Sequence, residues 1–133
     1  MQTFLPYADF VKTAQVLDYR RLGRQRVEAY QILRTLSGIS EGWSNHPAVR
    51  MWKGYELALS AYMNAMIREW VCRGYKNRML LVELSEPYPF PPWLGKPEFH
   101  AAHRSNLLRK NPEYYRKYWP EEPADLDYVW PAP

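Results

Sequence analysis

The sequence is poor in cysteine and has no long hydrophobic run. Cys72 is the only cysteine among 133 residues, so no internal disulfide can form and a metal site built from cysteines is excluded. No apolar stretch reaches the length of a membrane-spanning helix, and the chain does not start with a charged and then apolar leader. These absences predict a soluble cytoplasmic protein that neither spans nor binds a membrane.

The length predicts a single domain over residues 1–133, because a chain of this size can bury roughly two-thirds of its unfolded surface in one core. We expect a monomer. The net charge is +4, but the last four acidic residues all follow Lys117, and residues 1–120 carry 18 basic against 10 acidic side chains. A basic domain with a short acidic tail favours a polyanionic partner such as nucleic acid.

Four arginines lie within seven residues, near the start of a predicted helix over 17–37. They are Arg20, Arg21, Arg24 and Arg26. At 100° per residue, Leu22, Ala29 and Leu33 share one face of this helix and the first three arginines share the other. Arg26 falls at the edge of the apolar face, so we expect its guanidinium to be partly buried and paired with a carboxylate. Three arginines are left to face a partner.

The pattern as a whole predicts an all-α, compact single domain of three main helices. Apolar spacing indicates the other two helices over 47–73 and 98–110. Shorter helices are expected over 7–14, running into the helix over 17–37, and after residue 112.

The connecting segments are less regular. Residues 38–45 are rich in Gly, Ser and Asn and predict a loop, with Trp43 inserted among apolar groups. The segment 75–84 fits either a short strand or irregular chain. Five prolines between 87 and 97 exclude a regular element and predict an extended wrap over the helices. The apolar tail 128–131 is expected to dock on the domain.

Three motifs together resemble the pyrimidine-dimer DNA glycosylase (endonuclease V-like) family. They read DYRRLGR at 18–24, RGY at 73–75 and LLRKNPEYYRKY at 107–118. Their order and spacing match over most of the chain, except at the proline-rich segment. The resemblance implies an all-α fold, duplex DNA as the partner, no cofactor, and a place beside the nucleoid or in an infected host cell.

In that family, the N-terminal amine attacks C1′ of the damaged nucleotide and forms a Schiff base, and a glutamate on the first long helix assists. Flanking arginines hold the phosphates of a kinked duplex. An α-amine, with a pKa of about 8, is deprotonated more often than a lysine, and a carboxylate manages the proton transfers of ring opening. The resemblance implies that Arg20 and Arg24 bind phosphate and that the amine of Met1 is the nucleophile.

This sequence departs from the family at two points. Arg21 stands where the family glutamate is expected, and the bulky Gln2 predicts that Met1 is retained. Glu28 is a candidate replacement because it lies seven residues on, on nearly the same face, although about 10 Å further along the axis. The alternative for Glu28 is an ion pair with Arg24 at i+4.

Other candidate residues have two interpretations each. His46, before the helix start at Pro47, either transfers a proton in the site or caps the helix. His100 and His103 are spaced for two metal ligands on a helix, but no third ligand lies near them, so we expect no metal site. A second basic cluster predicts DNA contacts, with a solvated helix face as the alternative. It consists of His103, Arg104, Lys110, Arg116 and Lys117.

Three functions fit these observations. The first is a DNA N-glycosylase with lyase activity, acting through the Met1 amine or through water activated by Glu28. The second is a DNA-binding module that kept the scaffold and lost the chemistry, with Arg21 adding phosphate affinity. The third is an enzyme acting on free nucleotides, which predicts no duplex binding and little dependence on salt.

Overall fold

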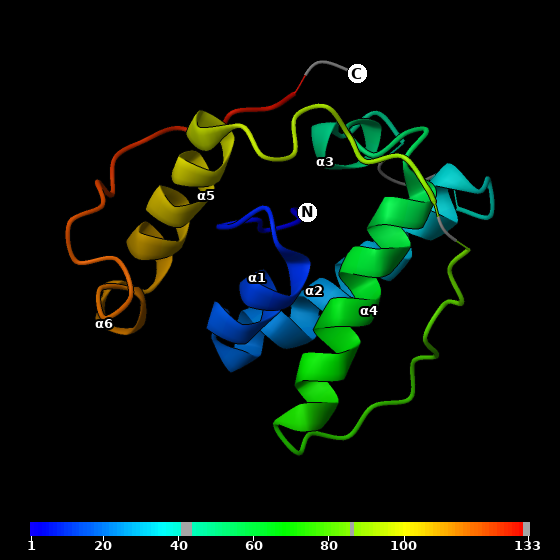
Figure 1. Ribbon diagram of the computed structural model, residues 1–133, viewed down its shortest axis with the longest axis horizontal. Coiled ribbons are helices and arrows are strands. Elements are labelled where there is room, and N and C mark those ends of the chain that lie inside the picture. The colour runs from blue at the N-terminus through cyan, green and yellow to red at the C-terminus, as the bar shows by residue number, and fades with distance from the viewer. Residues whose placement is uncertain (41–43, 86, 132–133) are drawn as a thin grey trace.

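The computed structural model describes residues 1–40, 44–85 and 87–131, and over these ranges it contains helices and no strand. The helices are α1 (Phe10–Val16), α2 (Tyr19–Leu36), α3 (Pro47–Arg50), α4 (Glu56–Cys72), α5 (Pro97–Lys110) and α6 (Pro112–Tyr115). The predicted all-α fold is confirmed, with α2, α4 and α5 as the three main helices (Figure 1). None of the described helices has the length and apolar character needed to cross a bilayer.

Helices α2 and α4 pack closely in the centre of the molecule. Leu22, Ala29 and Ile32 of α2 are fully buried, as are Leu59 and Met66 of α4. Gly23 allows the close approach, because a Cβ atom at this position would lie only 2.8 Å from Cζ3 of Trp70. The apolar face predicted for the first long helix is therefore the contact surface between these two helices.

The predicted single helix over 47–73 was wrong in one respect, since it is broken between α3 and α4. Gly54 adopts φ = 88°, a conformation that other residues rarely take. The side chain of Glu56 turns back and accepts a hydrogen bond from the Gly54 N–H at 3.1 Å. The break directs Trp52 into the core, where it is fully buried and packs edge-on against Trp93 at 5.0 Å between ring centroids.

After α4 the chain runs back along that helix without regular structure and passes α3 before it enters α5 (Figure 1). The segment 75–84 takes the irregular alternative, and the Asn64 side chain holds it through two hydrogen bonds to the Val82 backbone, at 2.8 and 2.9 Å. Trp93, in the proline-rich stretch, is buried and donates to the Met51 carbonyl at 3.2 Å. The predicted position of Trp43 lies outside the described residues.

The first residues of the chain lie between α5 and the α2–α4 pair (Figure 1). The Leu5 N–H donates to Nδ1 of His103 at 2.9 Å, and the Leu5 carbonyl lies 2.7 Å from Nδ1 of His100. Arg104, also on α5, donates to the Pro6 carbonyl at 2.8 Å. Three side chains of one helix therefore hold this segment in place.

The tail after α6 packs on α5, as the apolar residues at its end predicted. The Leu126 N–H donates to the hydroxyl of Ser105 at 2.9 Å, and Tyr128 packs against the core and edge-on against His103. Trp130 follows Tyr128 at 5.5 Å between ring centroids. The chain end thus returns to the side of the molecule that holds its first residues.

Candidate active site

A pocket of about 500 Å³ lies where the first residues, α2, α3 and the C-terminal tail meet. Its lining residues are Met1, Gln2, Phe4, Arg20, Arg21, Arg24, Gln25, Glu28, His46, Lys110, Tyr128 and Trp130. The three catalytic candidates, the three arginines of the predicted cationic face and Lys110 of the second basic cluster all belong to this set. Residues from opposite ends of the chain are therefore brought together at one place, which we call the terminal pocket.

The start of α2 sets the direction of the arginines. Asp18 is the N-cap and its carboxylate accepts from the Arg21 N–H at 3.3 Å, which satisfies a backbone donor at the helix start. Arg21 also forms an ion pair with Asp18, at 3.2 Å from Nη1 to Oδ1. Arg20 donates to the hydroxyl of its neighbour Tyr19 at 3.1 Å. Over the described residues, Arg24 has neither a hydrogen bond nor an ion pair within 4 Å, so its guanidinium can bind a ligand without breaking one.

Glu28 is linked to the N-terminal segment through Gln25. The Gln25 amide nitrogen donates to a carboxylate oxygen of Glu28 at 2.8 Å and to the Gln2 carbonyl at 2.9 Å. Sequence spacing placed Glu28 two helical turns from the family position, but the path of residues 1–4 over α2 brings the chain start to it. The alternative of a close Arg24–Glu28 ion pair does not occur, although Arg24 contributes to the electrostatics of Glu28.

The environment of Glu28 favours its neutral form more than water does. Burial raises the pKa of Glu28, and the positive charges of the N-terminal amine and Arg24 oppose this shift. Burial lowers the pKa of His46, and the charge of the same amine adds to this shift. Because Met1, Glu28 and His46 line the same pocket, the terminal pocket holds an amine, a carboxyl group and an imidazole.

His46 takes the capping role that was one of its two interpretations. Its Nδ1 accepts from the Ala48 N–H at 3.0 Å, at the start of α3. The ring also lines the terminal pocket and meets Trp130 edge-on at 6.0 Å between centroids. The cap fixes the ring orientation, so capping and a role in the pocket are compatible.

The second basic cluster is divided by the fold. His103 is buried and holds Leu5, and burial lowers its pKa to about 3, so it is neutral. Arg104 pairs with Glu122 at 2.7 Å and also holds Pro6. Only Lys110 reaches the terminal pocket.

The remaining two members lie beyond the pocket. Arg116 donates to the carbonyls of Pro120 and Glu122, at 3.3 and 2.9 Å. The ammonium of Lys117 lies 4.7 Å from the centroid of the Tyr114 ring. DNA binding by these two side chains stays a prediction.

Arg26 has a different partner from the one expected. Its guanidinium is partly buried, as predicted, but it lies 4.5 Å over the ring of Trp70 and donates to the side-chain oxygen of Asn77 at 2.6 Å. No carboxylate lies within ion-pair distance among the described residues. The expectation of a carboxylate partner was wrong because aromatic faces also attract guanidinium groups.

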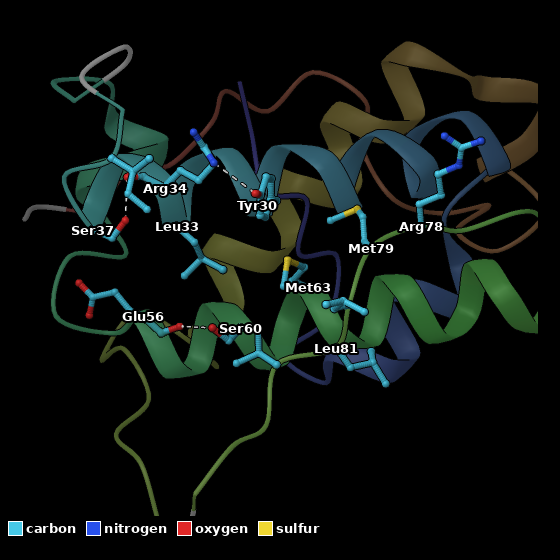
Figure 2. Close-up of a pocket in the computed structure, with 13 residues that line it drawn as sticks. Tyr30, Leu33, Arg34, Ser37, Glu56, Ser60, Met63, Arg78, Met79 and Leu81 are labelled. Atoms are coloured by element: carbon cyan, nitrogen blue, oxygen red, sulfur yellow. Dashed lines mark hydrogen bonds between the residues drawn. The ribbon is translucent and has the colours of Figure 1, made fainter.

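A larger hollow lies elsewhere on the described surface. It measures about 780 Å³ and is formed by α2, α4 and the chain at 78–82. Figure 2 shows that apolar side chains such as Leu33, Met63 and Leu81 converge there from these three elements. The terminal pocket, although smaller, is the place where groups able to transfer protons converge, and it is therefore the better candidate for an active site.

The terminal pocket also contains residues that the sequence did not single out. Gln25 is buried in the apolar stripe of α2, and a polar residue at such a position is a usable signal. Tyr128 and Trp130 gave no signal beyond an apolar tail. Among the residues with described positions, no three His, Cys, Asp or Glu side chains group closely enough to hold a metal ion.

The helical fold and this pocket define a class of protein in which cationic side chains surround an N-terminal amine and a carboxyl group. The family model for pyrimidine dimer DNA glycosylase matches residues 1–82, which is more than half of the chain. The protein belongs to the pyrimidine dimer DNA glycosylase family. No match was found among curated proteins or among solved structures. The family acts on DNA, and its match ends before α5 and the tail.

Proposed function

We propose that this protein removes a damaged or modified base from duplex DNA and then cleaves the strand, with the amine of Met1 as the nucleophile. The observation that supports this most is the terminal pocket itself, which holds Met1, Glu28, Arg20 and Arg24 together. An amine, a proton donor and a phosphate-binding group are what a glycosylase with lyase activity needs.

The reaction starts when the unprotonated amine attacks C1′ of the nucleotide. The bond from C1′ to the base breaks, and the base leaves with the bonding electrons and takes up a proton. The nitrogen then gives up a proton, and a proton donated to O4′ opens the sugar to a Schiff base. Loss of a proton from C2′ of the Schiff base then breaks the bond between C3′ and its oxygen, and the downstream strand leaves with a 5′ phosphate. We assign the donation to O4′ to Glu28, whose raised pKa leaves more of the carboxyl group protonated than an exposed glutamate.

Arg20, Arg24 and Lys110 are the proposed phosphate contacts. All three line the terminal pocket, and Arg20 and Arg24 come from one face of α2. A guanidinium binds phosphate with two parallel hydrogen bonds, so these side chains can hold the strand beside the nucleotide that reacts.

The pocket also has an aromatic side. Tyr128 and Trp130 line it from the tail, and Trp130 is 38% exposed. A base that leaves the duplex stack loses its neighbours, and stacking on an aromatic ring compensates for that loss. We assign this contact to Trp130.

A DNA-binding module without catalysis is the second candidate. It is favoured by Arg21, which stands at the position of the family glutamate and pairs with Asp18. In that case the arginines of α2 bind DNA and no bond is broken. The two candidates differ only in whether the amine reacts.

Borohydride trapping on a duplex with one abasic site separates the two. The first candidate predicts a covalent adduct, because borohydride reduces the Schiff base, and peptide mapping should place it on the Met1 nitrogen. Intact-mass measurement first confirms that the purified protein starts at Met1, and a preparation with an acetylated α-amine is the control. Binding without an adduct would establish the non-catalytic module. A lack of salt-dependent duplex binding would instead indicate an enzyme of free nucleotides.

A further inference from the structure

The side-chain amide of Gln25 has four hydrogen-bonding partners among the described residues. Its oxygen accepts from the Phe4 N–H at 2.9 Å and from the Tyr62 hydroxyl at 2.5 Å. Its nitrogen donates to the Gln2 carbonyl at 2.9 Å and to Glu28 at 2.8 Å. The Tyr62 hydroxyl also donates to the Phe4 carbonyl at 2.7 Å, so its one proton is shared between two oxygens. Both hydrogens of the Gln25 amide are used, in a residue that is 1% exposed.

The partners of Gln25 determine which way the amide points. The Phe4 N–H can only donate, so it requires the amide oxygen, and the Gln2 carbonyl can only accept, so it requires the amide nitrogen. A flipped amide would place its nitrogen against the Phe4 N–H, a donor, and its oxygen against the Gln2 carbonyl, an acceptor. The second hydrogen of the nitrogen is therefore directed at Glu28 by the network.

These contacts join two parts of the terminal pocket. Two of them hold the backbone of Gln2 and Phe4, which are separated by one residue. A third holds the Glu28 carboxyl group. We propose that Gln25 is a positioning residue that fixes the position of the Met1 amine relative to the Glu28 carboxyl group for the reaction. This inference rests on the proposed function for its catalytic consequence, but the geometry that it asserts can be measured without DNA.

Glu28 is also influenced by groups from other elements. The N-terminal amine and Arg24 carry positive charges near it, and its charge affects Tyr62 on α4 and Tyr128 in the tail. Gln25 differs from these groups because its side chain donates a hydrogen bond directly to the Glu28 carboxyl group. If the N–H donor of Gln25 is removed and the other groups stay unchanged, the titration of Glu28 should therefore change.

The variant Gln25→Glu tests the hydrogen bonds that the amide donates separately from those that it accepts. A carboxylate of the same shape can still accept from Phe4 and Tyr62, but when ionised it cannot donate to Gln2 or Glu28. We expect the rate of adduct formation at pH 8 to fall by about 10²-fold, the order of loss that a 1 Å misplacement produces, while the Kd for abasic duplex changes by less than about threefold. Gln15→Glu is the matched control, because Gln15 is exposed on α1 and outside the terminal pocket.

A titration followed by NMR of the Glu28 carboxyl carbon tests the positioning directly. The Gln25→Glu variant should raise the Glu28 midpoint by about one to two pH units, since it loses a hydrogen bond to the charged form and gains a nearby negative charge. Should this variant not fold, Tyr62→Phe keeps the donor of Gln25, removes one contact to its oxygen, and is expected to shift the midpoint only slightly.

The outcomes are distinguishable. Loss of the adduct rate with an unchanged Kd and a raised Glu28 midpoint supports the inference. A variant with wild-type rate and an unmoved midpoint overturns it. If the wild-type protein forms no adduct, the proposed function fails, and the positioning of Glu28 by Gln25 is then decided by the titration alone.

Discussion

Arg21 and Asp18 form an ion pair across one turn at the start of α2, at 3.2 Å. Asp18 is 7% exposed and also accepts from the hydroxyl of Tyr115. Arg21, which the family resemblance aligns with a glutamate, therefore compensates a nearly buried carboxylate. Its replacement by the family residue would place two carboxyl groups side by side.

We therefore expect Arg21→Glu to lower the free energy of unfolding and not to raise the rate of adduct formation. The loss should be about 1–3 kcal/mol, less than for a fully buried pair because Arg21 is partly exposed. Urea denaturation measures it. Arg20→Glu makes the same charge change without an ion pair to break, and an equal loss in both variants would contradict the role of Asp18.

Glu28→Gln tests the proposed proton donor. The amide keeps the size of the side chain and can still accept from Gln25, but it cannot donate an acidic proton. Single-turnover trapping with borohydride should show a rate about 10²- to 10⁴-fold lower, with an unchanged Kd for DNA. Glu98→Gln, on the exposed side of α5, should retain the wild-type rate. A Glu28→Gln protein that is still active would show that another group donates the proton.

Arg24→Ala tests the phosphate contacts of α2. Each phosphate contact contributes about 0.9 to the slope of log K against log salt concentration. Arg24 has no competing hydrogen bond to any described residue, so the slope should fall by about this amount in a fluorescence-anisotropy titration at several salt concentrations. Arg68→Ala, an exposed arginine on α4 outside the terminal pocket, should leave it unchanged. Equal slopes for Arg24→Ala and the wild type would remove α2 from the interface.

Trp130→Ala tests the aromatic side of the terminal pocket. Loss of one stacked base costs about 1–3 kcal/mol, which corresponds to a roughly 5- to 150-fold weaker affinity. A duplex that carries 2-aminopurine at an unpaired position reports stacking through quenching of its fluorescence. Trp130→Phe should restore most of the quenching, whereas Phe90→Ala, an exposed aromatic outside the terminal pocket, should not reduce it. Full quenching with Trp130→Ala would assign the contact elsewhere.

Acid should weaken the attachment of the N-terminal segment to α5. His103 has a pKa of about 3 in the folded protein and about 6.5 when unfolded, so the unfolded state binds the proton more tightly. Stability is therefore fully present above pH 6.5 and is lost as the pH falls towards 3, by about 2 kcal/mol at pH 5.

The variant His103→Gln isolates this contribution. Its side-chain oxygen can accept from the Leu5 N–H but does not titrate. Urea denaturation between pH 7 and 4 should show a smaller decrease of stability than in the wild type. Parallel curves for the two proteins would mean that His103 is not the titrating group.

The helices were predictable because their apolar residues recur at helical spacing, and the cationic face of α2 followed from the same periodicity. The break at Gly54 was not, since a glycine inside a periodic pattern is tolerated in many helices. The partner of Arg26 was not predictable because a guanidinium at the edge of an apolar face can either pair with a carboxylate or lie over an aromatic ring, as it does here over Trp70. Periodicity reports the face that a residue occupies and not the distant segment that meets it.

The terminal pocket shows the same limit. The family resemblance singled out Met1, and the chemistry of their side chains singled out Glu28 and His46. The N-terminal segment meets Glu28 through Gln25, whose partners Phe4 and Gln2 lie 21 and 23 residues away along the chain. Tyr128 and Trp130 reach the pocket through contacts of the tail with α5, which no local pattern encodes. Pairwise contacts across long sequence separations are the information that one sequence lacks.

The attachment of Leu5 to two histidines of α5 makes one half of the protein dependent on the other. The portion that matches the family model contains the proposed nucleophile, carboxyl group and arginines, yet the histidines that orient its leading residues come from the portion that does not match. A fragment restricted to the first portion would keep every proposed reacting group but lose the two histidines that hold the N-terminal segment in place.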